Sequence, residues 1–257
     1  MLQRDARNQA AAGQGRLTVA LARCDADIEE AQRLRYKVFA EEMGADIKSD
    51  KGLDVDKYDE YCRHLIVRDE DSGRAVGCYR LLTEEGARAL GGWYSESEFD
   101  LARIRHLLPH TVELGRACVH RDYRHGGTVM LLWSGLVKFM QAERLEYMIG
   151  CGSMSMADGG HFAASLYKKL AQTYLCPPEY RVFPHLPLPL PALRDDVAAE
   201  CPALIKGYLR AGAYICGEPA WDADFNCADV LIMMPMSRVS PRYLKKFTKY
   251  IAKDLAV

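Results

Sequence analysis

Apolar positions recur at helical spacing between Ile28 and Phe39. Asp27 precedes this stretch and has a glutamate three residues later, a pattern typical of a helix N-terminus, so we predict a helix that ends near Gly44. Arg35 lies on the apolar stripe of this helix. A cation is unusual there unless it meets an acid or a polar ligand; the alternative is a side chain that extends along the edge of the core to solvent.

Fully apolar and alternating runs predict the strands of an α/β domain. Two of them, 64–67 and 75–82, are joined by turn-forming residues 69–73 and predict a hairpin, with Arg80 in phase with apolar positions of the second strand. Residues 176–191 contain six prolines and predict an extended connector. Further strands are predicted at 112–119, 146–150, 214–216 and 230–234, and further helices at 103–110, 130–144, 163–170 and 203–211.

Composition restricts the class of protein. With 257 residues and 49% hydrophobic content, the chain can form one large α/β domain or a domain with a sizeable insertion. A net charge of −1 gives no argument for a nucleic-acid partner. Nine cysteines without a Cys-x-x-Cys pair predict reduced thiols and a cytoplasmic location. No apolar run reaches the roughly 18–20 residues that span a bilayer, and residues 1–16 predict a disordered N-terminal arm without a signal sequence.

Glu113 lies in an apolar, strand-like run together with Gly115 and Arg116. Residues three apart point to opposite faces of a regular strand, so Glu113 and Arg116 can face one site only if the strand has a bulge, which Gly115 favours. A bulge also frees a backbone N–H that can bind the carbonyl oxygen of a substrate. A buried carboxylate beside it can act as a base. The structural alternative is an internal salt bridge between the two side chains.

A basic, glycine-containing turn, Arg124-His125-Gly126-Gly127, stands directly before a long apolar helix pattern. Glycines let the backbone approach a ligand, and a helix N-terminus carries a partial positive charge. The turn therefore predicts an anion-binding site. A plain connection between a strand and a helix remains the alternative.

Other kinds of site find little support. His106 and His110 have helical spacing, but Pro109 interrupts the helix and no third ligand is placed, so we expect no metal site. The chain has no Gly-x-Ser-x-Gly elbow, no phosphate-binding Gly-x-x-x-x-Gly-Lys loop and no Gly-x-Gly-x-x-Gly fingerprint. Hydrolase, kinase and dehydrogenase functions are therefore not indicated.

From Pro241 onward the pattern predicts a basic amphipathic helix. Its apolar stripe contains Leu244, Phe247 and Ile251. The surrounding cations are Arg242, Lys245, Lys246, Lys249 and Lys253. Such a helix can contact an acidic surface, and its alternative role is to cap the fold.

In order, these elements resemble the GNAT acyltransferase superfamily: helix, hairpin, central strand, Arg-x-x-Gly turn, helix, strand, and then Leu166-Tyr167 on a following helix. The superfamily turn is Gln/Arg-x-x-Gly-x-Gly/Ala, and residues 124–129 match it except at Val129, which replaces the small residue beside the coenzyme A phosphate. The resemblance implies a GNAT-like α/β fold over residues 17–257, with a central mixed sheet flanked by helices and a C-terminal elaboration over about 176–257.

Val129 fits the branch of the superfamily that takes its acyl group from acyl carrier protein. Acyl-homoserine-lactone synthases, which belong to that branch, carry an Arg-x-x-x-Phe helix, two aspartates three apart, a strand arginine and a Glu-x-x-Arg. The residues here that resemble them are Arg35 and Phe39, Asp56 and Asp59, Arg80, and Glu113 and Arg116. The C-terminal half is more similar to bacterial L-ornithine N-acyltransferases, at residues 207–213, 224–229 and 241–244.

The resemblance, over about residues 17–250, implies transfer of a 3-hydroxy fatty acyl chain from acyl carrier protein to the α-amine of L-ornithine, giving a lyso-ornithine lipid. Glu113 would be the base and Tyr167 the acid that protonates the thiolate. The resemblance implies no metal or redox cofactor. The residues expected to bind the donor phosphopantetheine are Arg124, His125, Gly126 and Gly127. Those expected to order the acceptor are Arg35, Phe39, Asp56, Asp59, Arg80 and Arg116, the aspartates supplying negative charge for a cationic side chain.

Two other functions stay open at this point. One is an N-acyl amino acid or acyl-homoserine-lactone-type signal synthase, which differs in its acceptor. The other is a non-catalytic acyl- or membrane-binding module, in which the basic C-terminal helix would be the main functional element. The ornithine acyltransferase and the signal synthase would both act in the cytoplasm. The basic C-terminal helix would give either of them peripheral contact with the inner face of the cytoplasmic membrane.

Overall fold

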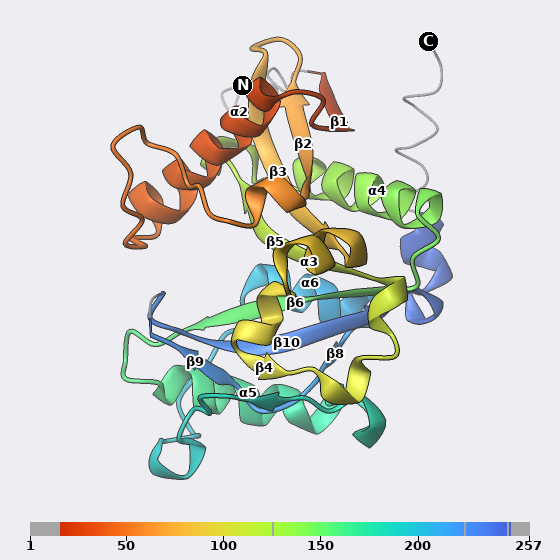
Figure 1. The fold of residues 1–257 in the computed structure, drawn as a ribbon. Coiled ribbons are helices and arrows are strands. Elements are labelled where there is room, and N and C mark those ends of the chain that lie inside the picture. The colour runs from red at the N-terminus through yellow and green to blue at the C-terminus, as the bar shows by residue number, and fades with distance from the viewer. Residues whose placement is uncertain (1–15, 125, 224, 246, 248–257) are drawn as a thin grey trace, which may run out of the picture.

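The computed structural model describes residues 16–124, 126–223, 225–245 and 247. Within them, a mixed sheet of eight strands runs through the molecule in the order β1-β2-β3-β5-β6-β10-β8, with β9 paired to β10 (Figure 1). Its strands are β1 (Leu17–Leu21), β2 (Arg63–Asp69), β3 (Arg74–Thr83), β5 (Thr111–Val119), β6 (Tyr147–Ser155), β8 (Tyr214–Ile215), β9 (Ala220–Asp222) and β10 (Cys227–Pro235). A separate pair is formed by β4 (Phe99–Asp100) and β7 (Phe183–Pro184).

Helices cover both faces of the sheet. They are α2 (Asp25–Tyr36), α3 (Glu84–Leu90), α4 (Gly127–Ala142), α5 (His161–Tyr174) and α6 (Ala203–Ala211). Leu34 of α2 shares a buried cluster with Ile66 of β2, whereas Leu136 of α4 shares another with Leu65 of the same strand. Since neighbouring residues of a strand point to opposite faces, α2 and α4 lie on opposite sides of the first half of the sheet. This is the α/β architecture that the pattern predicts.

Some predicted elements need correction. The helix predicted at 103–110 is wrong: Ala102–Ile104 and Leu108–His110 are single 3-10 turns, because Pro109 cannot continue a helix that begins before it. β1, α3 and β9 were not predicted. The predicted helix is confirmed, but it begins at Asp25 with Cys24 as its N-cap, so Asp27 lies in its first turn and is not the cap; it continues beyond α2 through the π-helical Lys37–Glu42. Other 3-10 turns lie at Asp59–Tyr61, Tyr94–Ser97, Arg121–Tyr123, Pro178–Tyr180, Leu190–Ala192 and Met236–Arg238.

The two predicted terminal segments lie largely outside the described residues. Of the N-terminal arm, only Arg16 is described. Residues 241–245 and 247 are helical, and Phe247 stacks on Trp133 of α4 with ring centroids 5.1 Å apart. Lys246, Lys249, Ile251 and Lys253 of the predicted basic helix lie outside the described residues. In the described part, no helix combines the length and apolar character needed to cross a bilayer.

The central sheet opens between β5 and β6. These strands are parallel, and their pairing covers only Thr111–Glu113 against Tyr147–Ile149. Beyond it, Gly150 approaches Leu114 so closely that a Cβ atom there would lie 2.5 Å from the Leu114 carbonyl oxygen. A residue with a side chain would force the strands apart at this point, so glycine sets where the opening starts.

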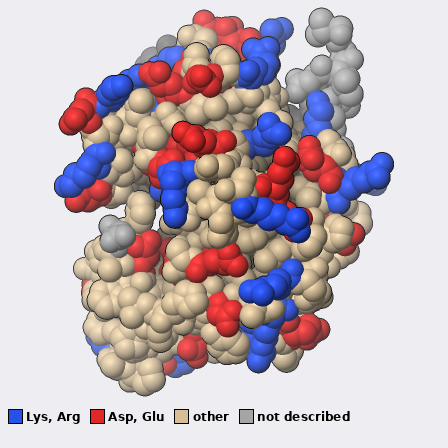
Figure 2. All heavy atoms as spheres, viewed as in Figure 1, with Lys and Arg blue, Asp and Glu red and all other residues tan. Residues whose placement is uncertain are grey.

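β5 contains the bulge that the sequence analysis requires. Its register against β3 shifts between Cys78 and Arg80, and Arg116 has a φ of 48°. The bulge lies directly beside the opening between β5 and β6. On the surface, Figure 2 shows cations and anions interspersed over the visible face, without a field of one sign, in keeping with 34 basic and 35 acidic residues.

Candidate active site

A cavity of about 900 Å³ lies where β5 and β6 separate. Apolar side chains form much of its wall: Val38, Phe39, Met43, Leu114, Met148, Leu204, Ile205, Ile232 and Met234. Polar side chains gather on other parts of it: Arg80, Tyr94, Glu113, Arg116, Ser153, Asp222 and Asp229. α6 closes one side. A cavity with apolar walls and few polar groups can take a fatty chain together with a small polar acceptor.

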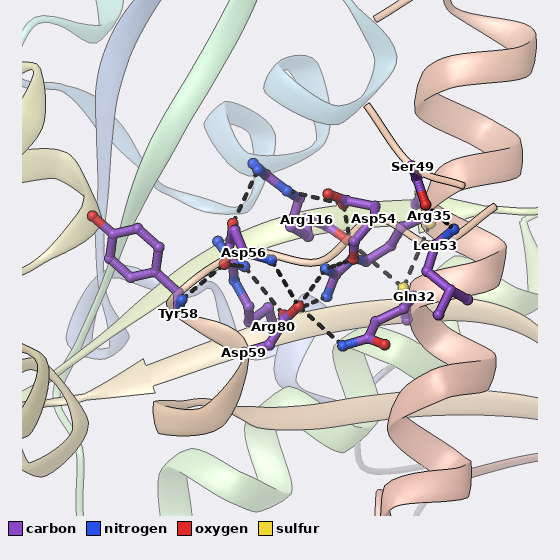
Figure 3. A network of polar contacts seen from close by, with 12 residues as sticks. Gln32, Arg35, Ser49, Leu53, Asp54, Asp56, Tyr58, Asp59, Arg80 and Arg116 are labelled. Carbon is purple, nitrogen blue, oxygen red and sulfur yellow. Dashed lines mark hydrogen bonds and ion pairs between the residues drawn. The ribbon is translucent and has the colours of Figure 1, made fainter. Parts of the chain in front are cut away.

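Three arginines and three aspartates form a closed ring of ion pairs beside this cavity (Figure 3). In order around the ring they are Arg35, Asp54, Arg116, Asp56, Arg80 and Asp59, which pairs again with Arg35. The six N···O distances lie between 2.6 and 3.2 Å. The ring joins α2, β3, β5 and the segment after Gly52. Four separate parts of the chain are thus held together by alternating charge.

The ring explains the buried cation on α2. Arg35 is 1% exposed, and its Nε donates to Asp54 at 2.9 Å while its Nη1 donates to Asp59 at 2.8 Å. Burial alone would raise the pKa of Asp59, but hydrogen bonding and charge from Arg35, with Arg80, hold that pKa at about 2. The expectation that Arg35 meets an acid is therefore confirmed. Asp54 was missed, because it lies in a loop without periodicity.

The predicted acceptor residues take different positions around the ring. Arg80, Arg116 and Phe39 line the cavity, whereas Arg35, Asp56 and Asp59 do not. None of the three aspartates of the ring lines the cavity, so the ring offers a cationic ligand no carboxylate there. Its geometry instead fixes two arginines at the cavity wall.

Glu113 stands at the last paired position of β5 before the strands separate. Its carboxylate accepts a hydrogen bond of 2.7 Å from the Tyr94 N–H and one of 2.8 Å from the Ser95 N–H. The Ser95 hydroxyl donates a third, very short hydrogen bond to it. Burial raises the pKa of Glu113, although the three donors and Arg80 act in the opposite direction.

Glu113 and Arg116 are not paired with each other. Arg116 Nε donates to Asp54 and Nη2 to Asp56, both at 3.1 Å, while Glu113 is held by the 3-10 turn Tyr94–Ser97. The internal salt bridge is therefore ruled out as the reason for this motif. Both side chains line the same cavity, as expected for a bulged strand.

The basic turn precedes α4 as predicted. Gly126 is the N-cap with a φ of 95°, a left-handed conformation that favours glycine, and Gly127 is the first helical residue. Arg124 lines the cavity, and its Nη2 donates to Glu42 at 2.7 Å. His125 lies outside the described residues.

Tyr167 is not brought to this cavity. It lies on α5, and no residue of α5 is among the described residues that line the cavity. Burial raises the pKa of Tyr167, with Glu218, Arg181 and Cys176 nearby. Three tyrosines do line the wall. Tyr208 lies on α6, and the other two, Tyr58 and Tyr94, which were not predicted as site residues, have ring centroids 5.3 Å apart. Burial raises the pKa of both phenols.

Because β5 and β6 pair only over their first residues and then separate around the cavity, the architecture is that of a GNAT-fold acyltransferase. The family model described as an acetyltransferase (GNAT) domain matches residues 34–134.

Relatives extend the match to most of the chain. The L-ornithine N(alpha)-acyltransferase of Agrobacterium fabrum is 37% identical over 251 residues, which cover 91% of this chain and 85% of that protein. That of Brucella abortus is 36% identical over 256 residues, which cover 91% and 89%. The chain belongs to the L-ornithine N(alpha)-acyltransferase family.

Solved structures support the fold alone. A coenzyme A-dependent acyl-homoserine lactone synthase, BjaI, superposes with a TM-score of 0.55 at 17% identity, covering 92% of this chain and 89% of its own. FeeM, an N-acyl amino acid synthase from uncultured soil microbes, has a TM-score of 0.53 at 10% identity, covering 90% and 94%. The GNAT-like fold implied by the sequence is confirmed.

Proposed function

We propose that this acyltransferase moves a 3-hydroxy fatty acyl group from acyl carrier protein to the α-amine of L-ornithine, giving a lyso-ornithine lipid. The observation that carries the proposal is the identity of 34–37% over about 90% of the chain with four L-ornithine N(alpha)-acyltransferases. The cavity supports it with apolar walls for an acyl chain and two arginines for an α-carboxylate.

The reaction requires the acceptor to lose a proton. An α-amine has a pKa of roughly 8 and attacks a thioester only as the free base. In the proposal, Glu113 takes that proton directly or through water. A carboxylate offers roughly four lone-pair sites, so the three donors already on Glu113 leave room for one more. Its raised pKa makes it a stronger base.

The remaining steps are assigned to the wall of the same cavity. The nitrogen bonds to the thioester carbon, and backbone N–H groups at the β5 bulge stabilise the oxyanion. The nitrogen then loses its second proton, the carbon–sulfur bond breaks, and the thiolate takes a proton from Tyr58 or Tyr94, which regains one from that nitrogen. Burial raises the pKa of both phenols, so in the proposal the tyrosine relays the proton and does not stay ionised. Arg80 and Arg116 bind the acceptor carboxylate through their planar guanidinium groups. Arg35, Asp56 and Asp59 hold those two arginines in place.

In the proposal, the phosphopantetheine arm of the acyl donor binds at the start of α4. Gly126, Gly127 and Arg124, with His125, bind the phosphopantetheine phosphate in the proposal, because the N-terminus of α4 and the cation attract it. For this, Arg124 must exchange Glu42 for the phosphate. Val129 disfavours coenzyme A and so favours acyl carrier protein. The basic segment after Pro241 contacts that acidic carrier or the inner face of the membrane.

Release of free carrier-protein thiol from 3-hydroxyacyl carrier protein, measured with a panel of amino acids, tests the proposal. Ornithine should give the fastest release, and release without dependence on any amino acid would contradict it. The second candidate is a signal synthase, favoured by 34% identity over 71 residues, 28% of this chain, with the acyl-homoserine-lactone synthase of Vibrio anguillarum. Preference for a neutral amino acid, or a lactone product, would identify that function instead.

A further inference from the structure

Asp229 is a buried carboxylate whose bonding is incomplete. It lies on β10 opposite Ser153 of β6, lines the cavity and is only 3% exposed. Its Oδ1 atom has no hydrogen-bond partner among the described residues. A buried acceptor without a donor costs free energy. Asp229 therefore points to a ligand that the protein itself does not supply.

Glu98 lies next to Asp229 and has the same deficit. Both of its carboxylate oxygens are shielded from solvent and have no hydrogen-bond partner of ordinary geometry in the described part of the chain, although the Cys151 thiol and the Asp229 carboxyl lie near enough to shift its pKa. Burial raises the pKa of Glu98, and the neighbouring Asp229 raises it further. Two carboxylates in contact repel each other unless a proton or a cation lies between them.

The acidic pair lies close to the proposed base. Cys151 connects the two places: its Sγ is 3.5 Å from Ser95 Oγ, which donates to Glu113. Cys151 lines the cavity, and burial, together with the charges of Glu98, Asp229 and Glu113, raises the pKa of its thiol. Glu113 and Asp229 both line the cavity, so one acceptor molecule in it can contact Glu113 at one end and the acidic pair, through Asp229, at the other.

We infer that Glu98 and Asp229 bind the side-chain ammonium of the acceptor and thereby select a basic amino acid. The inference rests on the proposed function. An ammonium group has three N–H donors and no acceptor, and the acidic pair offers three oxygens without partners. The aspartates of the ring, which the sequence analysis assigned to this role, already face three arginines. Burial and the neighbouring Asp229 raise the pKa of Glu98 to about 8, so the empty pair holds one proton at neutral pH, and the ammonium takes the place of that proton.

A metal ion is the competing occupant. Asp222, Cys227 and Asp229 each offer a ligand atom, and these atoms lie within 4.8 Å of one another. Burial raises the pKa of the Cys227 thiol, as does the charge of Asp229. The Cys227 Sγ donates to Asp229 Oδ2 at 3.6 Å, an internal hydrogen bond that a metal ion would have to break and that an ammonium at Asp229 Oδ1 would leave in place.

The test compares ornithine with norleucine, which has a methyl group in place of the side-chain ammonium. kcat/KM is measured with both acceptors for the wild type, Asp229→Asn and Glu98→Gln, with the exposed Glu143→Gln as control. We expect each acidic-pair variant to lose at least about tenfold with ornithine, mainly through KM, the order expected for hydrogen bonds to a charged group. Activity with norleucine should change little.

The outcomes distinguish failure of the proposed function from failure of the inference about Glu98 and Asp229. If the wild type does not acylate ornithine, the proposed function fails. If it does and the variants lose equally with both acceptors, or keep the ornithine preference, only the inference about the acidic pair fails. Thermal melting of each variant identifies loss of folding, and if either variant fails to fold, the other decides. A stoichiometric bound metal, with ornithine preference abolished by a chelator, would also overturn the inference.

Discussion

The backbone N–H of Ser95 donates a hydrogen bond of 2.8 Å to the carboxylate of Glu113, and the Ser95 hydroxyl donates to the same oxygen. This contact ties the last position at which β5 pairs with β6 to the 3-10 turn Tyr94–Ser97. It also places hydrogen-bond donors on a carboxylate whose pKa burial has raised. Ser95 thus lowers a pKa that the proposed mechanism uses.

Replacing Glu113 with glutamine should abolish acyl transfer. The amide keeps nearly the same shape but cannot accept the proton of the acceptor amine. We expect a loss of at least about a hundredfold in kcat, the range typical of a general base, while the Kd for carrier protein stays unchanged. Turnover is measured by thiol release at neutral pH. Unchanged turnover would remove Glu113 from the mechanism, and a variant that does not fold would show that its role is structural.

Replacing Ser95 with alanine should shift the pH dependence of kcat/KM. A base works only when ionised, so activity falls as the pH drops through the pKa of Glu113. The Ser95 hydroxyl lowers that pKa, and its removal raises it, so the acid limb should move to higher pH. Ser97→Ala, in the same turn but exposed, is the control. A lower rate with no movement of the limb would mean that Ser95 only supports the fold.

The ring of ion pairs should contribute strongly to stability. Arg35→Met removes a buried cation and leaves Asp54 and Asp59 underpaired, which costs about 3–5 kcal/mol in the free energy of unfolding. Arg33→Met is a matched control on the same helix, because its pair with Glu29 is exposed and such pairs contribute about 0.3–0.5 kcal/mol. Denaturant unfolding measures both. Similar losses for the two variants would show that the ring is no stronger than a surface pair.

Carrier protein should exceed coenzyme A as donor by at least about tenfold in kcat/KM, or about 1.4 kcal/mol. The reason is Val129, where the superfamily turn has a small residue. Arg124→Ala should raise the KM for the carrier-protein donor, and Arg121→Ala, from the adjacent 3-10 turn, should not. Equal kcat/KM values for the two donors would place this enzyme in the coenzyme A branch.

Local patterns predicted much of the fold and only part of the site. Periodicity identified the hairpin and α4, and it marked Arg35 as a cation that needs an acid. α3 was missed because it follows β3 without a break and is only seven residues long. Asp54 and Glu98 acquire their roles only when distant segments meet, which no local pattern records. Tyr167 was placed by resemblance alone, and its helix does not reach the cavity.

The most direct test of the account is the structure of the product. Purified protein is incubated with 3-hydroxyacyl carrier protein and L-ornithine, and the product is fragmented in a mass spectrometer. The account predicts one amide, on the α-nitrogen, with the side-chain amine free, and no product with Glu113→Gln. Acylation of the side-chain nitrogen, a lactone, or product formation that survives loss of Glu113 would contradict it.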